Sequence, residues 1–208
     1  MRTPIPARHF VLASAPLILL ILFLFAALGS EHEILWFFRV HKSEHDALRR
    51  LMFLITDWAN PLFYCVYALI LAWALKTKDK RLIRLVITFA VVQFIVNFLL
   101  LKGVKIAVGR PRPFFEGSWQ TFTLNPRCHS LPSGHTAEIT GAVLPLVLWL
   151  RRSWFSVLMG CVIALVGFTR VYLCEHFPSD VAMGWMFGGL AGCAAYYLWS
   201  KKADTRHA

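Results

Sequence analysis

The sequence predicts an all-α polytopic membrane protein, with six transmembrane helices in one bundle and an interfacial helix on the outer face. Its 208 residues are 58% hydrophobic and 16% charged, with a mean hydropathy of +0.58, whereas soluble domains are roughly 45–50% apolar. The apolar residues also form long uninterrupted runs, which are typical of membrane spans. No internal repeat or low-complexity segment divides the chain. We therefore expect one membrane-embedded domain, residues 1–208, with a polar core of motifs at residues 102–180.

The first span is expected at Phe10–Ser30, which contains no charged residue. This run is longer than the roughly 7–15 residues of a signal-peptide core, so we interpret it as an uncleaved helix. The segment Glu31–Arg50 follows and carries Trp36, Phe37 and Phe38. Such a polar and aromatic segment is typical of a helix lying in the membrane interface. The further spans are expected at Leu51–Leu75, Leu85–Leu101, Gly134–Leu150, Ser153–Thr169 and Val181–Ser200.

The charge distribution predicts the orientation. Six spans place both termini on one side, where the segments hold twelve Lys or Arg residues and two Asp residues. The opposite side holds ten Lys or Arg residues and nine Asp or Glu residues. Positive charge favours the cytoplasmic side, so we expect both termini in the cytoplasm of a bacterium and the polar loops on the periplasmic face of its inner membrane. The net charge of +11 then reflects topology and anionic lipid, and nucleic acid is not an expected partner.

Four cations converge on the expected outer face, and they indicate an anionic ligand. Lys105, Arg110, Arg112 and Arg170 lie at span ends, where charges are costly to desolvate and their mutual repulsion is unfavourable unless an anion lies among them. Arginine forks match phosphate oxygens in a bidentate manner, and lysine adds a point charge. We therefore expect a phosphoryl group here. The alternative is an anchor for lipid headgroups.

A second polar cluster opens the expected fourth span. Ser133 and Gly134 follow directly after Pro132. Serine suits a helix N-cap, glycine allows a ligand close to the backbone, and a helix N-terminus favours phosphate. His135 lies in the same first turn and is a candidate proton donor. The alternative is an ordinary capped helix start with a solvated histidine.

The third cluster lies between the last two expected spans. His176 and Asp180 are four residues apart, and Pro178 between them suits the first turn of a helix. Asp180 could then hold one imidazole nitrogen and leave the other nitrogen of His176 facing a substrate, as in a catalytic triad in which histidine itself attacks. The alternative is a His–Asp pair that closes a loop.

A metal site is the alternative to this interpretation. His135, Glu175, His176 and Asp180 all carry side chains that bind zinc. The sequence contains no His-Glu-x-x-His motif, and the surrounding cations would repel a divalent ion. We therefore expect neither a metal nor another cofactor. Glu175 receives no role from the sequence.

Together the three clusters resemble the signature of the type 2 phosphatidate phosphatase superfamily, which is Lys-x6-Arg-Pro, Pro-Ser-Gly-His and Ser-Arg-x5-His-x3-Asp. The matching residues are Lys105, Arg112 and Pro113, then Pro132 to His135, then Arg170, His176 and Asp180. Thr169 replaces the usual serine and keeps a hydroxyl group. The six-span layout resembles the membrane-bound members, and it disfavours the soluble haloperoxidase branch.

The resemblance implies metal-independent hydrolysis of a phosphomonoester or pyrophosphate by active-site loops on the outer membrane face. It implies that His176 attacks phosphorus to form a phosphohistidine, that Asp180 supports it, and that His135 protonates the leaving oxygen. Catalysis would be mainly electrostatic. The residues expected to hold the phosphoryl oxygens are Lys105, Arg112, Ser133, Gly134 and Arg170, with Arg110 and Thr169 as accessory residues.

The expected protein is thus a lipid phosphatase whose partner is a lipid phosphate in the membrane; no obligate protein partner is inferred. Candidate substrates are undecaprenyl pyrophosphate, phosphatidate, phosphatidylglycerophosphate and lipid A. A phosphotransferase acting on a second lipid would share the same residues, so both reactions stay open. A non-catalytic anion transporter is disfavoured, because the clusters lie at span ends and no inverted repeat is evident.

Two smaller expectations concern packing. Gly184, Gly188 and Gly192 recur every four residues, which favours close helix contact inside the bundle over dimerisation. Cys128 and Cys174 fall in polar stretches of the expected outer compartment, which permits a disulfide. Unpaired thiols are the favoured interpretation, because connectivity cannot be read from a sequence.

Overall fold

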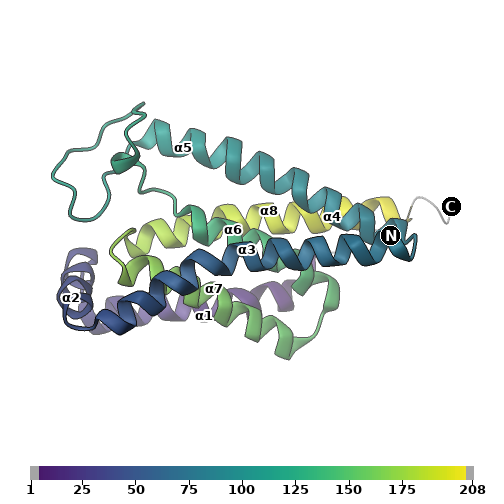
Figure 1. The fold of residues 1–208 in the computed structure, drawn as a ribbon, viewed down its shortest axis with the longest axis horizontal. Coiled ribbons are helices and arrows are strands. Elements are labelled where there is room, and N and C mark those ends of the chain that lie inside the picture. Colours follow the sequence, from purple (N-terminus) through teal and green to yellow (C-terminus); the bar gives the residue numbers. More distant parts are fainter. Residues whose placement is uncertain (1–4, 205–208) are drawn as a thin grey trace.

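The computed structural model describes residues 5–204 and the side chains of residues 5–201. Regular structure within them is helical throughout. Figure 1 shows the long helices in one bundle, with α2 crossing one end and the segment 109–130 looping out beyond α5 at that same end. The elements are α1 (Ala7–Leu28), α2 (Glu31–Glu44), α3 (Asp46–Lys76), α4 (Lys80–Gln93), the π-helix η1 (Phe94–Leu100), α5 (Leu101–Val108), the 3₁₀-helix η2 (Pro126–Cys128), α6 (Gly134–Leu150), α7 (Ser153–Tyr172) and α8 (Pro178–Asp204).

Five helical stretches of the described chain are long and apolar enough to cross a membrane. They are Ala7–Leu28, Asp46–Lys76, Lys80–Val108, Ser153–Tyr172 and Pro178–Lys201. The expected fourth span forms as α6, but its 17 residues extend only about 25 Å, less than the hydrocarbon core of roughly 30 Å. α6 is the centre of the bundle, packed against α8 and α7 and buried throughout residues 139–148. A crossing by α6, and hence the number six, stays a prediction.

The third expected span is longer than the sequence predicts. A polar segment was expected after Leu101, whereas α5 continues to Val108. The helix ends where Gly109 adopts a left-handed φ of +61°, a common helix C-terminus. Lys105 therefore lies in the last turn of a helix rather than in a loop.

The predicted interfacial segment also differs from expectation, because it divides between two helices. α2 ends at Glu44, and α3 begins at Asp46. At the other end, Ser30 and Glu33 form a capping box: the backbone N–H of Ser30 donates to Glu33 Oε2 at 2.6 Å, and Ser30 Oγ accepts from the N–H of Glu33 at 3.4 Å. Such a box begins a helix sharply, so α2 turns away from α1 and crosses the end of the bundle (Figure 1).

The glycine stripe of α8 packs against α6, which confirms the prediction of contact inside the bundle. A Cβ atom on Gly184 would meet the Ser133 carbonyl oxygen, and a Cβ atom on Gly192 would lie 2.6 Å from Leu144 Cβ. Gly188 likewise faces the carbonyl oxygen of Ala137. The absence of side chains lets the two backbones approach closely, and this contact brings the start of α8 to the first turn of α6.

The five cysteines are unpaired, and the favoured interpretation predicted this for Cys128 and Cys174. Cys128 and Cys174 are both buried. The Sγ atom of Cys128 lies 3.7 Å from Gln120 Oε1, and that of Cys174 lies 3.7 Å from the Leu35 carbonyl oxygen. Each thiol therefore packs in a separate local environment.

Candidate active site

Backbone hydrogen bonds bring the three sequence motifs together at the α2 end of the bundle. The N–H of Ser133 donates to the carbonyl oxygen of Asp180 at 2.9 Å, which joins the second motif to the third. The N–H of Ser130 donates to the Arg110 carbonyl oxygen at 3.0 Å. The 109–130 loop thus folds back from α5 to the start of α6, and residues far apart in the chain share one site.

Asp180 is fully buried in the first turn of α8, and its carboxylate is held on both oxygens. Oδ1 accepts from the Arg110 guanidinium at 2.7 Å. Oδ2 accepts from the Ser130 hydroxyl at 2.5 Å and from the N–H of Phe177 at 2.9 Å. A buried carboxylate needs such partners to offset its desolvation. Its position in the site is therefore well determined.

Arg110 joins this carboxylate to α2. Its Nη2 atom lies 2.9 Å from Glu31 Oε2, its Nη1 atom donates to Ser179 Oγ at 2.7 Å, and its guanidinium carbon lies 4.1 Å from the centre of the Phe177 ring. The sequence predicts an accessory phosphate contact for Arg110. The structure places the guanidinium on two carboxylates instead, because Glu31 approaches it from a helix that the motif does not include.

His176 lies beside Asp180 with 1% of its surface exposed. Its Nδ1 atom is 3.7 Å from Asp180 Oδ2, which is longer than a hydrogen bond, and it has no hydrogen-bond partner within the described side chains. Oδ2, the carboxylate oxygen nearest this nitrogen, already accepts from the Ser130 hydroxyl and the Phe177 N–H, so the predicted orienting bond stays a prediction.

Burial also sets the protonation of His176. It lowers the pKa of the imidazole to about 4; Asp180 acts in the opposite direction, and the charges of Arg170 and Lys105 lower the pKa further. The imidazole is consequently neutral at neutral pH, which is the form in which histidine can act as a nucleophile.

Two of the predicted phosphate-binding arginines meet at Glu175. The Arg112 guanidinium contacts Glu175 Oε2 directly, and Arg170 Nη2 lies 3.8 Å from the same oxygen. Arg170 also donates from Nη1 to Thr56 Oγ1 at 3.2 Å. Its Nε atom is buried without a hydrogen-bond partner among the described side chains. An unpartnered N–H on a buried cation is costly, and an anion would satisfy it.

The start of α6 lies against Lys105. A Cβ atom on Gly134 would be 3.6 Å from Lys105 Nζ. Ser133 occupies the N-cap position, but its hydroxyl accepts from Thr136 Oγ1 at 3.0 Å and caps no N–H group of the helix. His135 follows, and electrostatic interactions link it to Lys105, Arg112, Arg170 and His176. The structure thus brings both histidines together with Lys105, Arg112 and Arg170 near the start of α6.

Thr169 uses its hydroxyl group for a hydrogen bond within its own helix. Its hydroxyl donates to the Val166 carbonyl oxygen at 2.6 Å within α7, and the residue is fully buried. Sequence reasoning missed four other participants, which are Glu31, Thr56, Ser130 and Ser179. None of them carries a local signal, because each acquires its partner through tertiary contact. Among the described residues, no group of three or more His, Cys, Asp and Glu could hold a metal ion.

The fold and the site define a helical membrane protein with a buried neutral histidine beside a cluster of cations. The PAP2 superfamily model matches residues 81–204. The chain belongs to the PAP2 superfamily, as its three motifs predicted.

Relatives and a solved structure agree with this assignment. The chain is 33% identical to an undecaprenyl-diphosphatase of Sulfolobus acidocaldarius over 59% of each chain. It is 35% identical to a lipid A 1-phosphatase of Rhizobium etli over 44% of this chain and 40% of the relative. The chain therefore spans about half the length of these relatives. The crystal structure of a transmembrane PAP2 type phosphatidylglycerolphosphate phosphatase from Bacillus subtilis shares the fold, with a TM-score of 0.54 and 21% identity over 93% of this chain and 96% of that one. This likeness and the apolar helices support an integral membrane protein.

Proposed function

We propose that this protein is an integral-membrane lipid phosphatase that hydrolyses a terminal phosphate or pyrophosphate through a phosphohistidine, without a metal. The observation that carries the proposal is the buried, neutral His176 beside Arg170, whose Nε has no partner among the described side chains. The candidate nucleophile, His176, therefore lies next to a candidate anion-binding donor, Arg170. Family membership and the names of the relatives support the same reaction class.

The reaction follows from the roles of the two histidines. An imidazole nitrogen of His176, with Nε2 the candidate because Nδ1 faces Asp180, forms a bond to phosphorus while the bond from phosphorus to the lipid oxygen breaks. His135, as the imidazolium, donates a proton to that leaving oxygen and becomes neutral. His135 then takes a proton from water as the water oxygen attacks the phosphohistidine, which releases inorganic phosphate and restores His176.

The remaining groups stabilise charge. Lys105, Arg112 and Arg170 offset the negative charge that spreads over the phosphoryl oxygens during transfer. The backbone N–H groups of Ser133 and Gly134 at the start of α6 are candidates for the same task, because a helix N-terminus favours anions and the Ser133 side chain does not cap them. Asp180 supports His176 by its charge, with Arg110 and Ser130 as its anchors.

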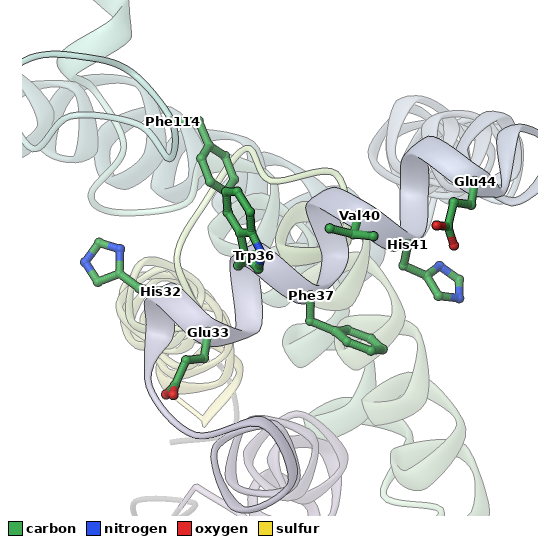
Figure 2. Close-up of a pocket in the computed structure, with 8 residues that line it drawn as sticks. All are labelled: His32, Glu33, Trp36, Phe37, Val40, His41, Glu44 and Phe114. Carbon is green, nitrogen blue, oxygen red and sulfur yellow. The ribbon is translucent and has the colours of Figure 1, made fainter.

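The site is proposed to lie at the periplasmic face of a bacterial inner membrane, with both termini in the cytoplasm. It lies at the bundle end opposite the start of α1 (Figure 1). α2 is proposed as the interfacial helix. Figure 2 shows Trp36, Phe37 and Val40 along α2, with Phe114 of the 109–130 loop beside Trp36. These side chains are exposed, and they line a surface cavity of about 690 Å³. Aromatic residues of this kind suit headgroup depth.

The test is a panel of lipid phosphates incubated with the purified protein in the presence of EDTA. Undecaprenyl pyrophosphate, phosphatidate, phosphatidylglycerophosphate and lipid A form the panel, and release of inorganic phosphate from at least one is expected. His176→Ala should abolish release and also the base-stable, acid-labile phosphoprotein trapped from labelled substrate. His45→Ala, at an exposed residue between α2 and α3, is the matched control. Undiminished turnover by His176→Ala contradicts the proposal, and label passing to an added lipid indicates the phosphotransferase.

A further inference from the structure

Glu175 occupies the position between the two phosphate-binding arginines. Its Oε2 atom contacts the Arg112 guanidinium and lies 3.8 Å from Arg170 Nη2. Glu175 is also the residue directly before His176. The turn that presents the nucleophile therefore presents a carboxylate to the same cations.

The backbone holds this arrangement in place. The N–H groups of Glu175 and His176 both donate to the Arg170 carbonyl oxygen, at 3.0 and 3.2 Å. On the other side, the N–H of Arg112 donates to the Arg127 carbonyl oxygen at 2.8 Å. These backbone hydrogen bonds fix the segments that carry Arg112, Arg170 and Glu175. The side chain of Glu175 keeps 37% of its surface exposed.

A carboxylate oxygen and a phosphoryl oxygen are equivalent ligands for a guanidinium, because both are charged acceptors that fit its fork. A phosphoryl group held by Arg112 and Arg170 must therefore take N–H groups that Glu175 now contacts, or bind with a negative charge adjacent to it. In either case the carboxylate of Glu175 weakens the binding of the phosphoryl group. Its partial exposure gives it solvent to move into when it is displaced.

We propose that Glu175 is a competing carboxylate, which weakens the binding of phosphate anions by Arg112 and Arg170 and so promotes release of the product. This inference rests on the proposed function for its biological meaning. Inorganic phosphate, the product, is held by the same guanidiniums as the substrate. When Glu175 contacts the two guanidiniums again, it promotes dissociation of the phosphate. The same competition also weakens the binding of the substrate.

The test compares the wild type with Glu175→Gln in the full chain, using inorganic phosphate as the probe. Titration calorimetry should show phosphate binding tightened by roughly fivefold in Glu175→Gln, which corresponds to about 1 kcal/mol, the upper value for a partly exposed ion pair. With a lipid phosphate that is turned over, KM and the inhibition constant of inorganic phosphate should both fall, while kcat does not rise. Glu116→Gln is the matched control, because this exposed carboxylate on the 109–130 loop undergoes the same charge change.

The opposite result would show that Glu175 serves to hold the two arginines in place. Unchanged or weaker phosphate binding by Glu175→Gln overturns the inference, as does equal tightening by Glu116→Gln. The proposed function fails separately, when the wild type releases phosphate from no member of the lipid panel. The calorimetric comparison still decides the role of Glu175 in that event, because it requires no turnover.

Discussion

The Arg110 guanidinium lies 2.7 Å from Asp180 Oδ1, across 70 residues of sequence. This pair joins the loop after α5 to the first turn of α8, and both side chains are withdrawn from water. Because Arg110 also contacts Glu31, the pair joins the proposed catalytic centre to α2. Arg110 thus holds Oδ1 of Asp180, whereas Oδ2 is the oxygen that lies nearest His176 Nδ1.

Arg110→Ala is expected to destabilise the protein and to lower kcat. Removing one partner of a buried ion pair leaves an uncompensated charge, at a cost of about 3–5 kcal/mol. Thermal unfolding in detergent measures the loss, and Arg127→Ala, at an exposed arginine of the same loop, should change little. Arg110→Lys separates the two roles: a raised KM with unchanged stability would show that Arg110 binds phosphate rather than anchoring Asp180.

On the acid side of the pH profile, the rate of phosphate release is expected to fall only in strong acid. kcat/KM requires neutral His176 in the free enzyme, and burial lowers its pKa to about 4. Protonation therefore removes the nucleophile as pH falls through about 4, and the acid limb should lie well below the ordinary histidine value of about 6.5. A pH profile of kcat/KM measures this limb. An acid limb at pH 6 to 7 that reports His176 would contradict the buried position described here.

Ser130→Ala is expected to move that limb upward. The Ser130 hydroxyl donates to Asp180 Oδ2 at 2.5 Å, and its removal concentrates the carboxylate charge near His176 Nδ1. Asp180 favours the protonated imidazole, so the pKa of His176 should rise. Loss of a hydrogen bond to a charged group should also cost about 1.5–3 kcal/mol of stability. A profile unchanged from the wild type would mean that Ser130 does not influence the Asp180–His176 pair.

Gly184→Ala is expected to disturb the site from within the bundle. A Cβ atom there would meet the Ser133 carbonyl oxygen and lie 3.1 Å from Thr136 Cβ, and overpacking of this kind costs about 1–3 kcal/mol. Gly189→Ala on the same helix is the control, since its Cβ would lie at an ordinary 3.7 Å from the Phe10 ring. Equal unfolding temperatures and rates for the two variants would contradict the close α6–α8 contact.

The sequence predicted the long helices and the three motifs of the site. The contacts that it did not predict have a physical explanation. Hydropathy identified the long helices because burial in lipid requires apolar runs, and three spaced motifs predicted which residues meet. The contacts of Arg110 with Glu31 and of Arg170 with Thr56 join residues 79 and 114 positions apart. No local pattern encodes such pairs. The same holds for the contacts of Asp180 with Arg110 and Ser130, which join residues far apart in the chain.

The contacts of Glu31 and Thr56 also set the boundary of the functional unit. The segment that defines the family begins at residue 81, and it contains every group proposed to react. Two of the side chains that position its arginines come from α2 and α3, which precede it. A graft of residues 81–204 into another membrane scaffold would therefore carry the proposed reacting groups without the two side chains that position their arginines. The proposed catalytic unit therefore includes the N-terminal helices.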